Sequence, residues 1–249
     1  MCMELQRQHT AMPRRTRYRS PSDIRTITLP SLLAEMHRPA LEARQLDFLA
    51  SSTQDGLASI YYSGDLSALR SRAISIVGTR EVSDEGRRRA RKLARELVAA
   101  GITIVSGLAK GVDTAALTAA IDAGGRTAAV IGTPLDKAYP AENATLQELI
   151  YGEHLLLTPF AIGERTFKGN FPKRNRVMAA ISDATVIVEA SDTSGTLHQA
   201  AECGRLKRWL FIMRSVADDP SLTWPKNFIN KPKVAVISST QDILDAIET

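Results

Sequence analysis

The spacing of the hydrophobic positions changes near residue 73. From there on, short apolar runs alternate with longer segments of helical period. The runs lack a polar residue at every second position, which is typical of parallel strands covered by helices on both faces. The sequence predicts strands at Ile74–Val77, Ile102–Val105, Thr127–Ile131, Leu155–Leu157, Thr185–Val188, Trp209–Met213 and Val234–Ile237.

The clearest helix lies between the first two predicted strands. Ser83 is a suitable N-cap, and Gly101 can close the C-terminus. The apolar positions recur at helical spacing and form one stripe that faces a core: Ala90, Leu93, Ala94, Leu97 and Val98. The other positions carry many cations, more typical of a solvated face than of a binding site: Arg87, Arg88, Arg89, Arg91 and Arg95.

Further helices follow the later strands. We expect one from about Asp113, as N-cap, to Gly124, and others over Arg174–Ile181, Thr196–Leu206 and Asp242–Ile247. A regular alternation of strand and helix predicts an α/β fold with a doubly wound, mostly parallel sheet.

Two segments precede this alternation. Residues 1–25 are polar and rich in arginine, and we expect a basic, disordered tail; an arm that touches phosphates is compatible with the same pattern. Residues 26–70 are expected to form a small helical lead-in, with an extended segment at Ser59–Ser63. Residues 71–249 then make up the α/β domain.

Composition narrows the function only slightly. The net charge of +5 and the pI of about 9.4 suit an anionic partner without identifying it. The two cysteines, Cys2 and Cys203, cannot build a disulfide framework or a metal site, which favours a reducing compartment. No apolar stretch suits a signal peptide or a membrane span. We therefore expect a cytoplasmic protein with no membrane partner, no metal and no cofactor.

Four loops that follow predicted strands carry glycine. In doubly wound sheets ligands bind at the carboxyl ends of the strands, where backbone N–H groups at helix starts suit an anion. Two of the loops also carry a cation, Arg80 or Lys110, and together they indicate a phosphate-bearing ligand. The candidate loop residues are Gly78, Thr79, Ser106, Gly107, Gly132, Ser194, Gly195 and Thr196.

The most informative segment is Phe171-Pro172-Lys173-Arg174-Asn175-Arg176. Three cations and an amide at a helix start are typical of a phosphate clamp, and Lys168 adds a cation upstream. Phe171 and Phe167 are candidates for stacking on bases, the alternative being that either one anchors the core.

These motifs together resemble one family. VGTR, SGLAKGVDTAA, LDKAYPAEN, FPKRNRVMAAIS and IVEASDTSGTL follow one another as in the DNA-processing protein (DprA/Smf) family, from about Ser63 to Phe211. The resemblance implies an extended Rossmann-like fold, a homodimer, and binding and protection of single-stranded DNA in a basic pocket. It also implies that the strand is handed to the RecA recombinase during DNA uptake or recombination, as in natural transformation.

The resemblance also implies roles for particular residues. By this resemblance the candidate DNA contacts are Arg80 and the cluster Lys173, Arg174, Asn175 and Arg176. Lys110 and the Ser106-Gly107 turn would shape the same pocket.

The chain departs from the family pattern in several places. Leu117 stands where the family usually has histidine, Ile212–Ser215 replaces a valine-proline-glycine turn, and Ser194–Gln199 replaces SGSLIT. The chain ends in one predicted helix, so we expect no C-terminal winged helix. These departures fit a divergent member, for example in a defence or mobile-element setting.

Two alternatives remain open. Phosphoribohydrolases of the wider superfamily carry a PGGxGTxxE turn, of which Gly195 and Thr196 match, but Gln199 stands at the glutamate position and cannot act as an acid or base. Glu189, Glu202 and His198 form no catalytic pattern, so we expect no catalysis. The other alternative is a sensor that holds a free or cyclic nucleotide at the same loops.

Overall fold

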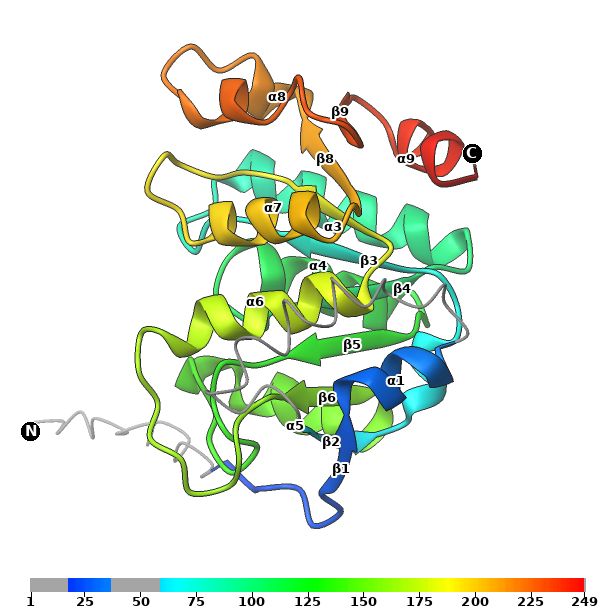
Figure 1. The fold of residues 1–249 in the computed structure, drawn as a ribbon, viewed down its shortest axis with the longest axis vertical. Helices are drawn as coiled ribbons and strands as arrows, with labels where there is room; N and C mark the ends of the chain where they lie inside the picture. The colour runs from blue at the N-terminus through cyan, green and yellow to red at the C-terminus, as the bar shows by residue number, and fades with distance from the viewer. Residues whose placement is uncertain (1–17, 37–58, 249) are drawn as a thin grey trace, which may run out of the picture.

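The computed structural model describes residues 18–36 and 59–248, which form one layered α/β structure (Figure 1). Its nine-stranded sheet has the order β1-β2-β6-β5-β4-β3-β7-β8-β9. From β6 to β9 every neighbouring pair is parallel. The predicted doubly wound sheet is therefore confirmed, and so are its seven strands: β3 (Ala73–Val77), β4 (Thr103–Ser106), β5 (Thr127–Val130), β6 (Leu155–Thr158), β7 (Ala184–Ile187), β8 (Trp209–Met213) and β9 (Val234–Ile237).

Helices cover both faces of the sheet. One layer contains α3 (Asp84–Ala99), α4 (Val112–Asp122), α5 (Ala144–Glu153) and α9 (Thr240–Glu248), and the other contains α1 (Leu29–Glu35), α6 (Asn170–Ile181) and α7 (Thr196–Arg205). In β5, Ala128 and Val130 pack on the second layer, while Ala129 and, just after the strand, Ile131 pack in the first. Every residue of the strand is buried, which explains the absence of polar alternation. A short helix, α8 (Arg214–Ala217), follows β8.

The described part of the lead-in extends the sheet. Strand β1 (Arg25–Thr28) pairs antiparallel with β2 (Ser59–Gly64), which pairs antiparallel with β6. The expected extended segment corresponds to β2, where Ile60 and Tyr62 are buried on one side. The helices that were expected in this segment correspond to α1 and to a short 3₁₀ turn, Leu66–Leu69. Residues 1–17, expected to be a tail, and residues 37–58 lie outside the described residues.

The segment just before β1 is fastened to α5. The Tyr18 hydroxyl donates to the Leu135 carbonyl oxygen at 2.7 Å and accepts from Gln147 Nε2 at 2.8 Å. Arg19 forms an ion pair with Glu148 at 3.3 Å. Burial raises the pKa of Tyr18, so its hydroxyl keeps its proton and remains a donor. Residues 18–19 are thus held against α5, in the helix layer to which α5 belongs.

Two helix starts differ from the sequence prediction. Gly111, not Asp113, is the N-cap of α4, and the buried Asp113 carboxylate instead accepts from the backbone N–H groups of Gly107 (3.1 Å) and Ala109 (3.3 Å). Asp113 thereby ties the loop after β4 to the first turn of α4. Helix α6 begins at Asn170, four residues before Arg174, so most of the basic segment is helical.

Helix α3 follows the prediction, whereas α5 was not predicted. The Ser83 hydroxyl accepts from the backbone N–H of Gly86 at 2.9 Å, as expected of an N-cap. In α5 only Gln147 and Ile150 are buried, so no apolar stripe marks this helix in the sequence.

Candidate functional site

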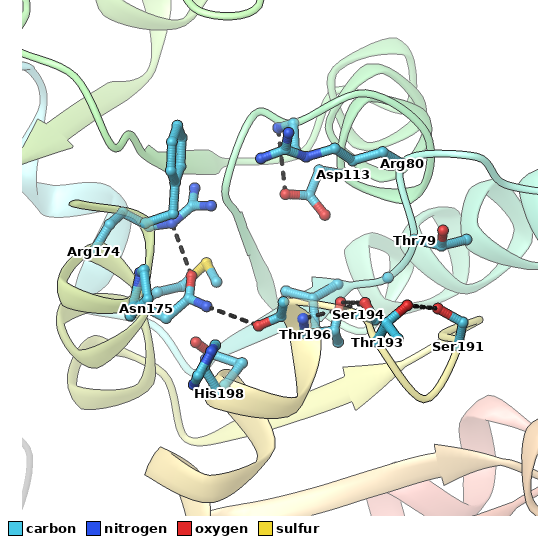
Figure 2. Close-up of a pocket in the computed structure, with 18 of the residues that line it drawn as sticks. Thr79, Arg80, Asp113, Arg174, Asn175, Ser191, Thr193, Ser194, Thr196 and His198 are labelled. Atoms are coloured by element: carbon cyan, nitrogen blue, oxygen red, sulfur yellow. Dashed lines mark hydrogen bonds between the residues drawn. The ribbon is translucent and has the colours of Figure 1, made fainter. Parts of the chain in front are cut away.

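A cleft of about 560 Å³ lies at the carboxyl ends of the strands (Figure 2). The loops after β3 and β7 and the start of α6 provide most of its walls. It brings together many of the predicted site residues: Gly78, Thr79, Arg80, Lys168, Phe171, Arg174, Asn175, Ser194, Gly195 and Thr196. A smaller recess shares Arg80, Phe171 and Arg174 with it and adds Gly107, Lys110 and Gly132.

Arg80, Phe171 and Tyr139 form a cationic and aromatic ledge in this cleft. The Arg80 guanidinium lies over the Phe171 ring, 5.4 Å from its centroid, and the Tyr139 ring lies 5.6 Å from that of Phe171. Phe171 also packs against Gly132, where an added Cβ would come within 2.7 Å of the ring. The ledge therefore depends on a glycine beneath Phe171, while Arg80 remains exposed.

Tyr139 was not among the predicted site residues. It is 48% exposed and lines both the cleft and the recess. The available signal was its position in the motif LDKAYPAEN, directly before Pro140. An exposed aromatic ring in a cleft that also holds a guanidinium gives a base or another planar group a surface for stacking.

Arg174 differs from Arg80 because it is only 6% exposed. Its Nη1 donates to the carbonyl oxygens of Gly107 and of Val130 (2.6 Å), and its Nε donates to Asn175 Oδ1 at 2.9 Å. These bonds join the carboxyl ends of β4 and β5 to α6. Within the described chain the remaining nitrogen, Nη2, has no hydrogen-bond partner. Arg174 therefore shapes the cleft floor with most of its donors already engaged.

Asp113 is the nearby negative charge that balances Arg174. Burial raises the pKa of Asp113, and the guanidinium acts in the opposite direction. Burial lowers the pKa of Arg174, and the Asp113 charge raises it. Because an arginine stays protonated in proteins, we regard the two groups as a buried charge pair.

Hydroxyl groups line the wall formed by the loop after β7 (Figure 2). Ser194 Oγ donates to Thr196 Oγ1 at 2.9 Å and accepts from the Thr196 backbone N–H at 3.2 Å. Asn175 Nδ2 donates to the Gly195 carbonyl oxygen at 3.4 Å, which connects this loop to α6. The wall offers neutral donors and acceptors beside the cations of Arg80 and Lys168.

Several predicted residues lie outside the main cleft. Arg176 pairs with Glu202 at 3.5 Å, on the side of α7, and neither it nor Lys173 belongs to the cleft lining. Lys110, in the recess, forms an ion pair with Glu142. Ser106 is fully buried and donates to the Ile76 carbonyl oxygen at 2.7 Å. Phe167 is 63% exposed and is not part of the lining either.

Glu189 and Gln199 have structural partners in the fold. Glu189 accepts from the backbone N–H and the hydroxyl of Ser83, at 2.9 and 2.6 Å, and so fastens the start of α3 to the loop after β7. Gln199 is buried and donates to Thr185 Oγ1 at 3.1 Å. His198 is exposed and lines the cleft. Among the described residues no cluster of histidine, cysteine or acidic side chains suits a metal ion.

Leu117, which stands where the family pattern has histidine, is a core residue. It is fully buried beside Ile131 and Ile150, between α4, α5 and the sheet.

Within the part of the chain that the structure describes, no helix has the length and apolar character needed to cross a bilayer.

Comparison with known proteins gives consistent matches. The family model described as DNA recombination-mediator protein A matches residues 43–248. A Protein Smf from Synechocystis is 38% identical over 186 residues, which is 73% of this chain and 47% of that protein. The chain spans about half the length of this relative and of a DNA processing protein DprA from Streptococcus pneumoniae.

Solved structures agree with the sequence matches. The crystal structure of DNA processing protein A from Streptococcus pneumoniae aligns with a TM-score of 0.72 and 30% identity, over 90% of this chain and 74% of that one. A structure of DNA processing protein A from Helicobacter pylori, at 24% identity, has the same fold, with a TM-score of 0.70 over 90% of this chain and 95% of that one. The motifs, the fold and the family match agree, and this chain belongs to the DNA recombination-mediator protein A family.

Proposed function

We propose that this protein binds single-stranded DNA in the cleft and catalyses no reaction there. The observation that carries the proposal is the ledge, in which an exposed guanidinium lies over the Phe171 ring and the Tyr139 ring lies against Phe171. A cation for phosphate next to a stacking surface is the combination that single-strand binders use. DNA processing protein A from Helicobacter pylori, which has the same fold and binds single-stranded DNA, supports the proposal.

In this proposal each part of the cleft has a separate role. Arg80 and Lys168 contact phosphates, and the exposed Tyr139 ring stacks on a base. The hydroxyl wall of Ser194 and Thr196 hydrogen-bonds to sugar or phosphate oxygens. Because these contacts do not read base edges, we expect little sequence preference.

Absence of catalysis is part of the same proposal. It is supported by the structural bonds of Glu189 to Ser83 and of Glu202 to Arg176 and Arg205. Gln199, at the position of the hydrolase glutamate, is also engaged with Thr185.

We also propose that the protein acts as a cytoplasmic homodimer that hands the strand to RecA. The support is the family description as a recombination mediator and the names of its relatives as DNA processing proteins. Analytical ultracentrifugation tests the dimer, and a RecA filament-assembly assay on coated single-stranded DNA tests the transfer.

Fluorescence anisotropy with labelled oligonucleotides of increasing length tests DNA binding. We expect affinity that rises with length, falls steeply with salt and exceeds the affinity for duplex DNA. Arg80→Gln should lose about tenfold in affinity, the size of one lost charge-assisted contact. Arg70→Gln is the matched control, since Arg70 is exposed but lies before the amino end of β3, away from the cleft.

The same titration distinguishes DNA binding from nucleotide sensing, and a separate assay for a released base tests for a phosphoribohydrolase. A cleft of about 560 Å³ also has the size of a nucleotide site. A mononucleotide that binds tightly, together with no dependence on strand length, would favour the nucleotide sensor. Release of a free base from a nucleotide would instead show a phosphoribohydrolase.

A further inference from the structure

Three arginines form a row along the outer surface of α3. Arg87, Arg91 and Arg95 are separated by four residues each, so their side chains lie one above another along the helix. Arg91 and Arg95 are exposed and Arg87 is half-buried. Within the described residues none of the three forms an ion pair or a hydrogen bond through its guanidinium. We call these three residues the arginine row.

The remaining cations of α3 differ from the row because they are neutralised. Arg88 and Arg89 form ion pairs with Glu85, and Lys92 forms an ion pair with Glu96 at 3.7 Å. The sequence pattern suggested one solvated basic face, whereas the structure separates a paired group from an unpaired one.

Two members of the paired group, Arg89 and Lys92, lie on the flank of the helix opposite to the row. Arg89, Lys92 and Glu96 face a groove beside α8 and the start of α9. Val98, three residues after Arg95, packs against Gly125 at the end of α4, so close that a Cβ on this glycine would overlap it. The arginine row is therefore on the flank toward α4, away from both acidic residues.

The row begins near the cleft. Arg80 lies in the loop that joins β3 to α3, and Glu189, just after β7, binds the N-cap Ser83.

The spacing of the row suits a phosphate backbone. Successive arginines of the row are about 6 Å apart along the helix axis, from a rise of 1.5 Å per residue. Phosphates of a stacked strand are about 3.4 Å apart, and unstacking increases that distance, so successive guanidinium groups can reach successive phosphates.

We propose that single-stranded DNA leaving the cleft past Arg80 continues along α3, with its phosphates on Arg87, Arg91 and Arg95. This inference rests on the proposed function, because the cleft supplies the first contacts of the strand. It adds an unassigned phosphate track to the site and makes the binding footprint longer than the cleft.

Two matched triple variants test the track. Arg87→Gln/Arg91→Gln/Arg95→Gln removes the row, and Arg88→Gln/Arg89→Gln/Lys92→Gln removes three paired cations from the same helix. Both change the net charge equally, and glutamine keeps the helix propensity of the replaced residues. Circular dichroism melts establish that both variants are folded before binding is measured.

Binding is measured with a short oligonucleotide that fills only the cleft and with a long one. The row variant should bind the short strand as the wild type does but lose at least about tenfold in affinity for the long strand. On the long strand its salt dependence should fall by about 2 in log–log slope, at about 0.7 for each lost phosphate contact. The paired-cation variant should behave as the wild type on both.

Other results overturn the track. Equal losses for the two triple variants would show a general charge effect, and unchanged long-strand binding by the row variant would show that no track exists. If the wild type binds no oligonucleotide of any length, the proposed function itself fails. If the wild type binds the short strand normally and the row adds nothing on the long strand, only the track is disproved and the proposed function stands.

Discussion

Arg174 lies so close to Gly107 that a side chain at the glycine would displace its guanidinium. Its Nη1 donates to the Gly107 carbonyl oxygen, and a Cβ added to Gly107 would overlap the guanidinium. The same nitrogen reaches the Val130 carbonyl oxygen. One buried cation thus connects the ends of two neighbouring strands with the helix that carries the basic segment.

We therefore expect Arg174→Ala to reduce stability strongly. The change would leave Asp113 as a buried carboxylate without its counter-charge, which typically costs about 3–5 kcal/mol of unfolding free energy. Urea denaturation measures the effect, with the exposed Arg165→Ala as control, expected within about 0.5 kcal/mol of the wild type. A stable Arg174→Ala protein that has lost only DNA affinity would instead show that Arg174 acts by direct contact.

Gly132→Ala should weaken DNA binding by disturbing the ledge. The new methyl group would lie 2.7 Å from the Phe171 ring and push it from its place beneath Arg80. We expect a several-fold increase in Kd by anisotropy. Gly204→Ala is the control, because an added Cβ there meets no atom within 4 Å. An unchanged Kd for Gly132→Ala would exclude the Phe171 position as a determinant of affinity.

Cys203 should be unreactive in the folded protein. It is fully buried, its Sγ lies 3.1 Å from Thr185 Oγ1, and burial raises the pKa of its thiol to about 12. In a Cys2→Ser background, Ellman's reagent should label no thiol under native conditions and should label Cys203 once urea unfolds the chain. Rapid native labelling would mean that α7 opens readily from the sheet.

Asp192 should make stability depend on acid pH. It accepts from the backbone N–H groups of Thr223 and Trp224, at 3.0 and 2.9 Å, and these bonds lower its pKa. A lowered pKa means that the carboxylate stabilises the fold above the unfolded-state pKa and that this contribution is lost as pH falls through the folded-state value.

The test compares Tm for the wild type and Asp192→Asn. The wild type should have the higher Tm at pH 7, and the difference should shrink as pH falls from about 5 to about 3. A difference that stays constant over this range would show that the charge of Asp192 contributes nothing. The bonds fasten the loop that carries Ser191 and Thr193, so the variant should also bind DNA less tightly.

The sequence predicted the parallel strands well because each is a short buried run. It did not predict α5, whose buried face is formed by few side chains. It also could not separate Arg174 from Arg176, because a run of cations does not show which side chain faces the core. Tyr139 was missed because only the fold brings it beside Phe171, which lies far along the chain.

The position of β3 has a consequence for synthesis. β3 lies between β4 and β7, yet β4, β5 and β6 all leave the ribosome before β7 does. Until Ala184–Ile187 emerges, one edge of β3 has no partner, and the wall formed by Ser194–Thr196 does not yet exist. Because long-range pairing forms late, a nascent chain has only part of its cleft until Ser194–Thr196 has emerged. The cleft therefore becomes complete long after Arg80 has been made, once the loop after β7 has joined it.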